Sequence, residues 1–380
     1  MNSYLKKVKQ VKWKYFGSRE TSLIFYSLVA ESYKYMFPKL GWSDFASGWS
    51  NIYFCAHGLI IKAFGKKSDI KKSTKAIKKK LAYNPQILKT LYELTEKEIK
   101  KTQQIINPLK NIITKKNLKS KDFKHFYIQF KNSFLSFFPL QVFPLLIELS
   151  LESETQKLSD KRFINILTKW RKVSHQTEIE LENLLSLFLN KGRKHLKIDF
   201  IYWTDYEVMN YFTNSKKPKA SKISHRKSFY LMIRDINLNP PYKIYMGQSA
   251  KSAYKILQKL TEEKVKGSEF KGNPLVKGKV KGEVFLIRNK NDFKRLPANK
   301  IVVAKVIEMD DIKVLKNKKI TAIITEEGGL TSHIAIASRE FMVPLMMGVK
   351  GITSNLKSGN LLEVDATKGI IKKIKTKLFD

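Results

Sequence analysis

The stretch that most constrains the fold of this chain is residues 320–349, where an apolar run, a glycine pair and an amphipathic segment follow one another. The β-branched run 320–325 stops at turn residues, which predicts a buried strand. The glycine pair that follows predicts a tight loop. Thr331 or Ser332 can cap a helix whose apolar positions then recur at helical spacing. A second apolar run closes the stretch, so the order predicts strand, loop, helix and strand in an α/β domain.

His333 falls in the first turn of the predicted helix. Free backbone N–H groups and the positive end of the helix dipole lie there, and both favour a group that carries negative charge. A neutral imidazole is a nucleophile near neutral pH. A phosphoryl group on His333 would therefore be stabilised at this place. The alternative is a histidine packed in the core, but such packing requires neither the glycine pair nor the two hydroxyl residues before it.

A run of matching residues joins these features: Gly328, Gly329, Leu330, Thr331, Ser332 and His333, followed by Ala335, Ile336, Ala337, Arg339, Glu340 and Pro344. This run resembles the phosphohistidine signature of the phosphoenolpyruvate-utilising enzymes, which include phosphoenolpyruvate synthase, pyruvate phosphate dikinase and the rifampicin phosphotransferases. The resemblance implies that His333 accepts and donates the phosphoryl group. It also implies that the five residues before His333 bind the phosphate, and it points to no metal ligand in this chain.

The resemblance continues on both sides, through the glycine-rich segment 278–284 and the segment 358–369, and covers roughly residue 272 to the C-terminus. It implies a mobile, swivelling β/β/α domain. We expect strands at 279–287, 301–304, 320–325, 343–349 and 361–364, and helices at 309–315 and 332–340. Gly278 and Gly282 are interpreted as hairpin and bulge glycines. One departure is that this chain has no glycine at the end of the second helix, where relatives usually place one before the aliphatic–proline pair.

Residues 1 to about 195 are predicted to be mostly helical, because apolar residues recur at three- and four-residue spacing in 22–37, 88–106 and 181–189. An aromatic, strand-like run then meets a helix that Thr204 caps, with Glu207 in the capping-box position. These residues and the Ile-x-x-Arg element at 223–226 are similar to the helical segment before the swivelling domain of rifampicin phosphotransferase-like proteins. His225, which lies beside Arg226 and Lys227, could contact a phosphate, or it could simply be an exposed loop residue.

The sequence therefore predicts a multidomain α plus α/β protein. It has a mostly helical domain for acceptor or partner binding at 1–264, a hinge linker at 265–273 and the swivelling domain at 274–380. The apolar stretch 134–151 contains Glu148 and two prolines, so we expect a buried helical hairpin or a kinked helix rather than a membrane span. A single cysteine and the lack of a signal-peptide pattern favour a cytoplasmic location.

The formal net charge of +40 makes nucleic acid a candidate partner. Against this, only nine of the 73 basic residues are arginine, the residue that best makes bidentate phosphate and base contacts. The lysines are dispersed over the whole chain, and the sequence contains no nucleic-acid-binding fingerprint. A solvated, lysine-rich surface is the simpler interpretation, and an acidic partner protein remains an alternative.

Larger relatives also carry an ATP-grasp nucleotide-binding domain and, in several, a barrel for the phosphoryl acceptor. We recognise neither pattern in this sequence. We therefore expect a phosphoenolpyruvate synthase-like phosphotransferase component that is incomplete on its own and binds no cofactor alone. A separate ATP-grasp partner would charge His333 with ATP or phosphoenolpyruvate and Mg²⁺, for transfer to a small-molecule acceptor. The alternatives are a non-catalytic scaffold or regulatory protein that keeps the fold, and a basic nucleic-acid-binding protein.

Overall fold

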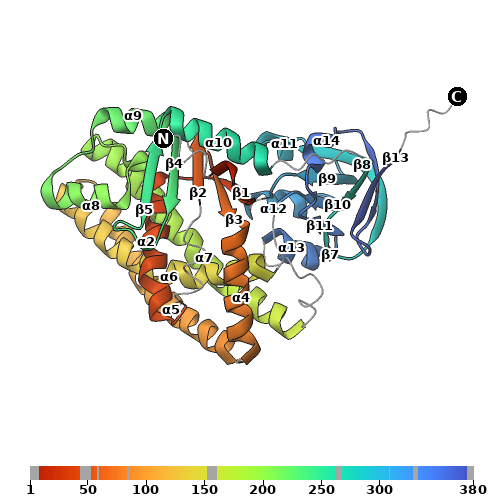
Figure 1. Cartoon of the computed structure of the whole chain (residues 1–380), viewed down its shortest axis with the longest axis horizontal. Coiled ribbons are helices and arrows are strands. Elements are labelled where there is room, and N and C mark those ends of the chain that lie inside the picture. The colour runs from red at the N-terminus through yellow and green to blue at the C-terminus, as the bar shows by residue number, and fades with distance from the viewer. Residues whose placement is uncertain are drawn as a thin grey trace. The chain divides into compact units, whose positions relative to one another are not determined.

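The computed structural model describes residues 8–42, 53–57, 60–83, 86–151, 161–261, 268–307, 309–327 and 333–374. The chain divides into two compact units, Met1–Thr261 and Glu262–Asp380 (Figure 1). In this structure part of the predicted linker, 265–273, is strand. Strand β6 (Glu269–Lys271) lies within it, and strand β7 (Asn273–Val276) begins at its last residue. The Gly, Ser and Lys content suggested a connection, but the buried side chain of Phe270 anchors β6 in the core of the second unit.

The first unit has the helical character that the sequence predicts. Its described helices are α2 (Leu23–Lys39), α4 (Lys67–Tyr83), α5 (Gln86–Ile113), α6 (Ser120–Leu151), α7 (Lys161–Lys191), α8 (Asp205–Asn214), α9 (Ala220–Ser228) and α10 (Gln248–Thr261). A π-helical turn, η1 (Gly192–Leu196), and a 3-10 turn, η2 (Phe200–Tyr202), join α7 to α8. The aromatic run before Thr204 was expected to be strand-like and is a 3-10 turn instead.

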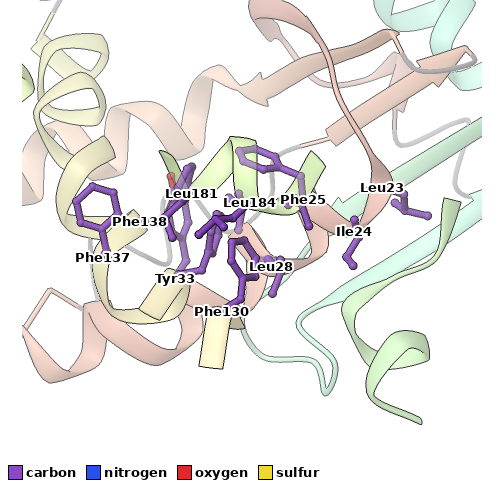
Figure 2. Close-up of a cluster of buried hydrophobic side chains, with 14 of the residues drawn as sticks. Leu23, Ile24, Phe25, Leu28, Tyr33, Phe130, Phe137, Phe138, Leu181 and Leu184 are labelled. Atoms are coloured by element: carbon purple, nitrogen blue, oxygen red, sulfur yellow. The ribbon is translucent and has the colours of Figure 1, made fainter. Parts of the chain in front are cut away.

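Helix α6 contains the apolar stretch that raised the question of a membrane span. It is one continuous helix with Pro139 and Pro144 inside it, so the hairpin alternative is wrong. A phenylalanine stripe at helical spacing is buried along it: Phe123, Phe126, Phe130, Phe134 and Phe137. Side chains from α2, α6 and α7 meet in this core (Figure 2). Among the helices that the structure describes, none combines the length and the apolarity needed to cross a membrane.

The first unit also contains a five-stranded antiparallel sheet that the sequence analysis missed. Its strands are β1 (Trp13–Glu20), β2 (Tyr53–His57), β3 (Ile60–Lys66), β4 (Phe229–Arg234) and β5 (Tyr242–Met246), in the order β1-β3-β2-β4-β5. Alternate side chains face two cores, as the period of a strand requires. Phe54 and Ala56 join the core of the long helices, whereas Cys55 packs with Ala253 and Leu257 of α10.

The second unit is built on an eight-stranded sheet. The remaining strands are β8 (Lys279–Ile287), β9 (Lys300–Ala304), β10 (Ile320–Thr325), β11 (Leu345–Met347), β12 (Leu361–Asp365) and β13 (Ile370–Ile374). The strand order is β6-β13-β12-β8-β9-β10-β11-β7. Strands β8, β9, β10 and β11 run parallel, so their carboxyl ends share one edge of the sheet. The described helices are α11 (Lys290–Lys294), α12 (Met309–Lys316), α13 (His333–Phe341) and α14 (Ile352–Asn355).

All five strands and both helices expected for this unit are present, with ends that differ by up to two residues. The two faces of the sheet bury separate cores: Ile301 and Val303 of β9 face one, and Val302 and Ala304 face the other, together with α12 and α13. The bulge expected at Gly282 is absent, since the pairing of β8 with β12 has no register shift. A Cβ at Gly282 would lie 3.2 Å from the Ile301 side chain, so close packing explains this glycine.

Candidate functional site

The structure places the start of α13 at the carboxyl edge of the parallel strands. His333 is the first residue of α13, and β10 ends at Thr325, so the chain leaves β10 at that edge eight residues before His333. Ligands of open α/β sheets bind at the carboxyl ends of the strands. The predicted phosphate-binding residues, Gly328, Gly329, Leu330, Thr331 and Ser332, lie outside the described residues, as does the side chain of His333. The backbone position of His333 in the first turn agrees with the prediction.

The chain that leads into this loop is held on both sides. Beyond the end of β10, the backbone N–H of Glu326 donates to the carbonyl of Ala304, at 3.2 Å, and that of Glu327 donates to Lys305, at 2.9 Å. On the other side, the N–H of Val349 donates to the carbonyl of Thr325, at 3.0 Å. The stem of the loop is therefore fixed by hydrogen bonds to the chain following both neighbouring strands.

The carboxylate of Glu326 joins this stem to the turn after β11. Its Oε1 accepts hydrogen bonds from the backbone N–H of Thr353, at 2.8 Å, and from the Thr353 hydroxyl, at 2.6 Å. Thr353 is the second residue of α14, whose N-cap residue Gly351 has no side chain to offer. Glu326 thus caps α14 from a different strand, and its negative charge lies at the positive end of that helix.

The neighbouring carboxylate, Glu327, pairs with a lysine. Its Oε1 lies 3.4 Å from Nζ of Lys305, the residue that follows β9, and the Glu327 side chain is 11% exposed. Two carboxylates directly before a phosphate-binding loop would repel an incoming phosphoryl group. Here Glu326 binds hydrogen-bond donors and Glu327 binds a cation, so both charges are compensated by groups of the domain itself.

Helix α13 packs as its sequence pattern predicts. Ile334, Ala335 and Ser338 are buried against the sheet face that α12 also covers. At the other end of the helix, Val343 N–H donates to the Ser338 carbonyl at 3.1 Å, and Met342 adopts a left-handed φ of 53°. This six-to-one bond and the left-handed residue form a Schellman C-cap, the place where glycine is favoured. This backbone conformation explains why relatives usually have a glycine at this place, where this chain has Met342.

The structure gives a structural role to Arg226, the neighbour of the second predicted phosphate contact, His225. Arg226 is buried, and its guanidinium binds Glu207 through two hydrogen bonds, of 2.6 and 3.0 Å, and the carbonyl of Tyr202 at 2.8 Å. Glu207 closes the predicted capping box with Thr204 and also accepts from Lys222. Arg226 therefore joins α9 to α8 and is not available to a phosphate, whereas His225 is exposed on α9.

The same contacts set the ionisation of Glu207. Burial raises the pKa of this carboxyl, but the hydrogen bond and the charge of Arg226, with a further hydrogen bond from Lys222, lower it to about 2 overall. Glu207 thus stays ionised over the whole physiological range. The sequence pattern identified the helix cap but not the arginine nineteen positions further on, because that contact depends on how two helices pack.

Sequence reasoning missed Lys305 and Thr353, which hold the stem of the candidate loop. Lys305 pairs with Glu327 and Thr353 with Glu326, directly before the predicted phosphate-binding loop. The only sequence signal for such partners was that two acidic residues stand next to a loop expected to bind a phosphate. Within the part of the chain that the structure describes, no three His, Cys, Asp or Glu side chains gather as a metal site would require.

Comparisons with known proteins agree with this geometry. The sequence model of the PEP-utilising enzyme, mobile domain matches residues 296–369. A probable phosphoenolpyruvate synthase of Pyrococcus horikoshii is 33% identical over 136 residues, which are 34% of this chain and 16% of that protein. A phosphoenolpyruvate-protein phosphotransferase of Mycoplasma pneumoniae is 36% identical over 80 residues, 21% of this chain and 14% of that protein.

The matched stretches therefore span about a sixth of these relatives. A solved structure of Enzyme I (nEIt) aligns over 76% of this chain and 80% of its own length, at 13% identity and a TM-score of 0.24, which is too low to support a conclusion about the fold. The sequence matches and the strand–loop–helix order around His333 point the same way. Residues 296–369 are a PEP-utilising enzyme mobile domain, which gives this chain partial homology to the phosphoenolpyruvate synthases.

Proposed function

We propose that this chain is a phosphotransferase component that carries a phosphoryl group on His333. The observation that carries the proposal is the start of α13 at His333, at the carboxyl edge of four parallel strands and within the residues that the family model matches. The compensated charges of Glu326 and Glu327 support it, because neither of these two carboxylates next to the loop is left unpaired.

The chemistry consists of two displacements at phosphorus. A ring nitrogen of neutral His333 attacks the phosphorus of the donor, an N–P bond forms, and the P–O bond to the donor breaks with its electron pair on the leaving oxygen. An oxygen of the acceptor then attacks the same phosphorus and the N–P bond breaks, which restores the imidazole. The first-turn N–H groups of α13, the loop amides of 328–332 and the hydroxyls of Thr331 and Ser332 would stabilise the phosphoryl oxygens.

The donor reaction is assigned to a separate protein. We propose that an ATP-grasp partner charges His333 with ATP and Mg²⁺, or that phosphoenolpyruvate does so, and that the first unit binds the acceptor or the partner. The relatives named phosphoenolpyruvate synthase support this assignment, and the stretches that match this chain are 16% and 11% of their length.

An acid-labile, alkali-stable labelling assay tests the proposal. The purified chain is incubated with labelled phosphoenolpyruvate, and separately with ATP labelled at the β or γ phosphate together with cell extract. We expect label on the wild type and none on His333→Ala. His225→Ala is the matched control, because His225 is an exposed histidine of the first unit, and it should label fully.

Two other results would contradict the proposal. Label that persists in His333→Ala would place the phosphoryl group on another residue. A folded chain that takes no label from any donor or extract would favour the scaffold alternative, and tight, steeply salt-dependent nucleic-acid binding without any need for His333 would favour the basic binding protein.

A further inference from the structure

The first unit has a surface hollow that the phosphohistidine chemistry does not use. It has a volume of about 350 Å³ and lies where the end of the π-helical turn, the loop after α8 and one side of α9 meet. This volume is at the lower end of the range for small-molecule sites. Its chemically distinctive lining residues are three lysines, Lys197, Lys217 and Lys227, and three apolar side chains, Ile198, Trp203 and Ile223.

The hollow is strongly cationic. In the described part of the chain, Lys197, Lys217 and Lys227 form no ion pair with a carboxylate. Instead, the ammonium groups of Lys217 and Lys227 lie 5.8 and 5.9 Å from the ring centroids of Tyr211 and Tyr202. Cation–π contacts hold these lysines without neutralising their charge. Three cations around one hollow therefore remain available to an anion.

The acidic residue in the lining does not cancel this charge. One oxygen of Asp199 lies 3.2 Å from Nη2 of Arg193 and caps the 3-10 turn through the N–H of Ile201. The start of α9 adds to the positive potential, since Ala220 lines the hollow and Lys219, the N-cap residue, provides no side-chain acceptor for the first N–H groups. The electrostatics therefore favour a ligand with more than one negative charge.

The base of the hollow is apolar and rigid. Ile198 and Trp203 are 4% and 5% exposed, and Ile223 is half-buried beside them. The ring of Trp203 is fixed by edge contacts with Phe200 and Tyr211, at centroid distances of 5.1 and 5.9 Å. A flat apolar group could bury surface here while its charged end meets the lysines.

The backbone at Lys197 is a further sign of a dedicated site. This lysine has a left-handed φ of 56° directly after a π-helical turn. Glycine or asparagine would adopt that conformation with less strain, and π-helical turns are frequent at functional sites. Lys197 is the C-cap residue of this turn and lines the hollow, although a lysine in this conformation costs local stability.

We propose that this hollow binds a phosphomonoester whose organic part is a flat apolar ring. The lysines and the start of α9 would bind the phosphate, and Trp203 with its neighbours would bind the ring. This proposal rests on the proposed function in one respect: it takes the ligand to be the phosphorylated product of the acceptor. Binding itself does not require His333.

Phenyl phosphate is the minimal probe, with inorganic phosphate and phenol as its two halves. Binding to the full chain is measured by ligand-observed NMR titration at physiological salt, and repeated with His333→Ala. We expect phenyl phosphate to bind at least ~10-fold more tightly than either half, because charge-assisted hydrogen bonds and ring burial then act together. We expect His333→Ala to bind as the wild type does, so a failure of the labelling assay and a failure of this one are distinguishable.

Two pairs of variants test the location. The double variant Lys197→Gln with Lys227→Gln should weaken phenyl phosphate binding at least ~10-fold, while Lys216→Gln, an exposed lysine outside the hollow, should change it less than about twofold. Ser224→Glu adds a carboxylate to the lining and should abolish binding. Ser228→Glu adds the same charge to the opposite end of α9, outside the lining, and should not.

Three results would overturn the proposal. The first is no binding of phenyl phosphate by folded protein. The second is equal binding of phenyl phosphate and inorganic phosphate, which would show that the ring is not recognised. The third is equal losses from Lys216→Gln and the double variant, which would show only diffuse attraction of anions to a lysine-rich surface.

Discussion

At the scale of single residues, Met342 shows a local cost that the fold imposes. Its left-handed φ of 53° at the end of α13 is a conformation that costs an L-residue about 1–2 kcal/mol, whereas glycine adopts it freely but loses more entropy on folding. Its side chain is 83% exposed and therefore contributes little packing. We expect Met342→Gly to increase the free energy of unfolding by up to about 1 kcal/mol.

Thermal and urea unfolding would measure this gain. Met342→Ala is the matched control, because it removes the exposed side chain but keeps the Cβ atom that causes the strain. It should leave the stability within about 0.5 kcal/mol of wild type. Equal gains in both variants would show that the exposed side chain, and not the backbone conformation, is responsible.

Glu207 makes a second residue-scale prediction, on pH. Its pKa is lowered from 4.5 to about 2 in the folded chain, so its contribution to stability is complete above the unfolded value and is lost as the pH falls from about 4.5 through about 2. Glu207→Gln leaves Arg226 buried without its anion. We expect a loss of about 2 kcal/mol at pH 7, below the roughly 3–5 kcal/mol for a fully buried pair, because Glu207 keeps some contact with solvent.

The measurement is urea unfolding of both proteins between pH 7 and pH 2. The difference between wild type and Glu207→Gln should shrink as the carboxyl of the wild type protonates. Glu93→Gln serves as the control, since the Glu93 side chain is 58% exposed and its substitution should change little at any pH. A difference that stays constant down to pH 2 would show that the ionised pair does not provide the stabilisation.

At the scale of elements, the bond from Glu326 to Thr353 ties the chain before the candidate loop to α14. Thr353→Val keeps the shape of the side chain but leaves a half-buried carboxylate without its hydroxyl donor, which should cost about 1–2 kcal/mol. If this bond positions the loop, labelling of His333 should also slow about 10-fold, because phosphoryl transfer depends on positioning.

Thr353→Ser keeps the hydroxyl and should restore both stability and labelling. The rate of label incorporation is compared with the melting temperature for each variant. A valine variant that loses stability but labels at the wild-type rate would limit Glu326 to a structural role.

Elements with strong local patterns could be predicted from the sequence. Five of the eight strands of the second unit and two of its four described helices were predicted, from the apolar runs and turn residues around His333 and from the resemblance to the phosphoenolpyruvate-utilising enzymes, and the capping box of Thr204 and Glu207 was correct in detail. The sheet of the first unit was missed for two reasons. The pairing of β2 with β4 joins segments more than 160 residues apart and leaves no local pattern. The pairs β2–β3 and β4–β5 join consecutive strands, but these short strands were overlooked beside the helical spacing of the neighbouring segments.

The residues of the candidate site also differ in whether the sequence alone could identify them. The nucleophile and the predicted phosphate-binding loop could be named from one contiguous motif. Lys305 and Thr353 could not, because they come from the ends of other strands and reach Glu327 and Glu326 only when the sheet forms. The roles of His333 as nucleophile and of Gly328 to Ser332 stay predictions, since these loop residues and the side chain of His333 lie outside the described part of the chain.

At the scale of the whole molecule, the net charge of +40 is the dominant property. Because 73 cationic side chains meet only 33 carboxylates, at least 40 cations have no carboxylate to pair with one to one. Self-repulsion among them destabilises the compact state, and salt screens it: the Debye length falls from about 30 Å at 0.01 M to about 8 Å at 0.15 M ionic strength. Added sodium chloride should therefore raise the melting temperature over this range.

A gain of about 1 kcal/mol corresponds to a rise of about 1 °C for a 380-residue chain that unfolds as a whole, which calorimetry can detect. The same titration separates two explanations of the charge. Suppose that the lysines outside the hollow serve only solvation. Sodium chloride and phosphate at equal ionic strength should then raise the melting temperature equally in a variant with Lys197 and Lys227, two lysines of the hollow, replaced by Gln. In the wild type, phosphate bound in the hollow should give a small additional rise. A melting temperature that does not change with sodium chloride would show that the cations are too far apart to repel one another. The excess of lysine would then be better explained by binding to an acidic partner.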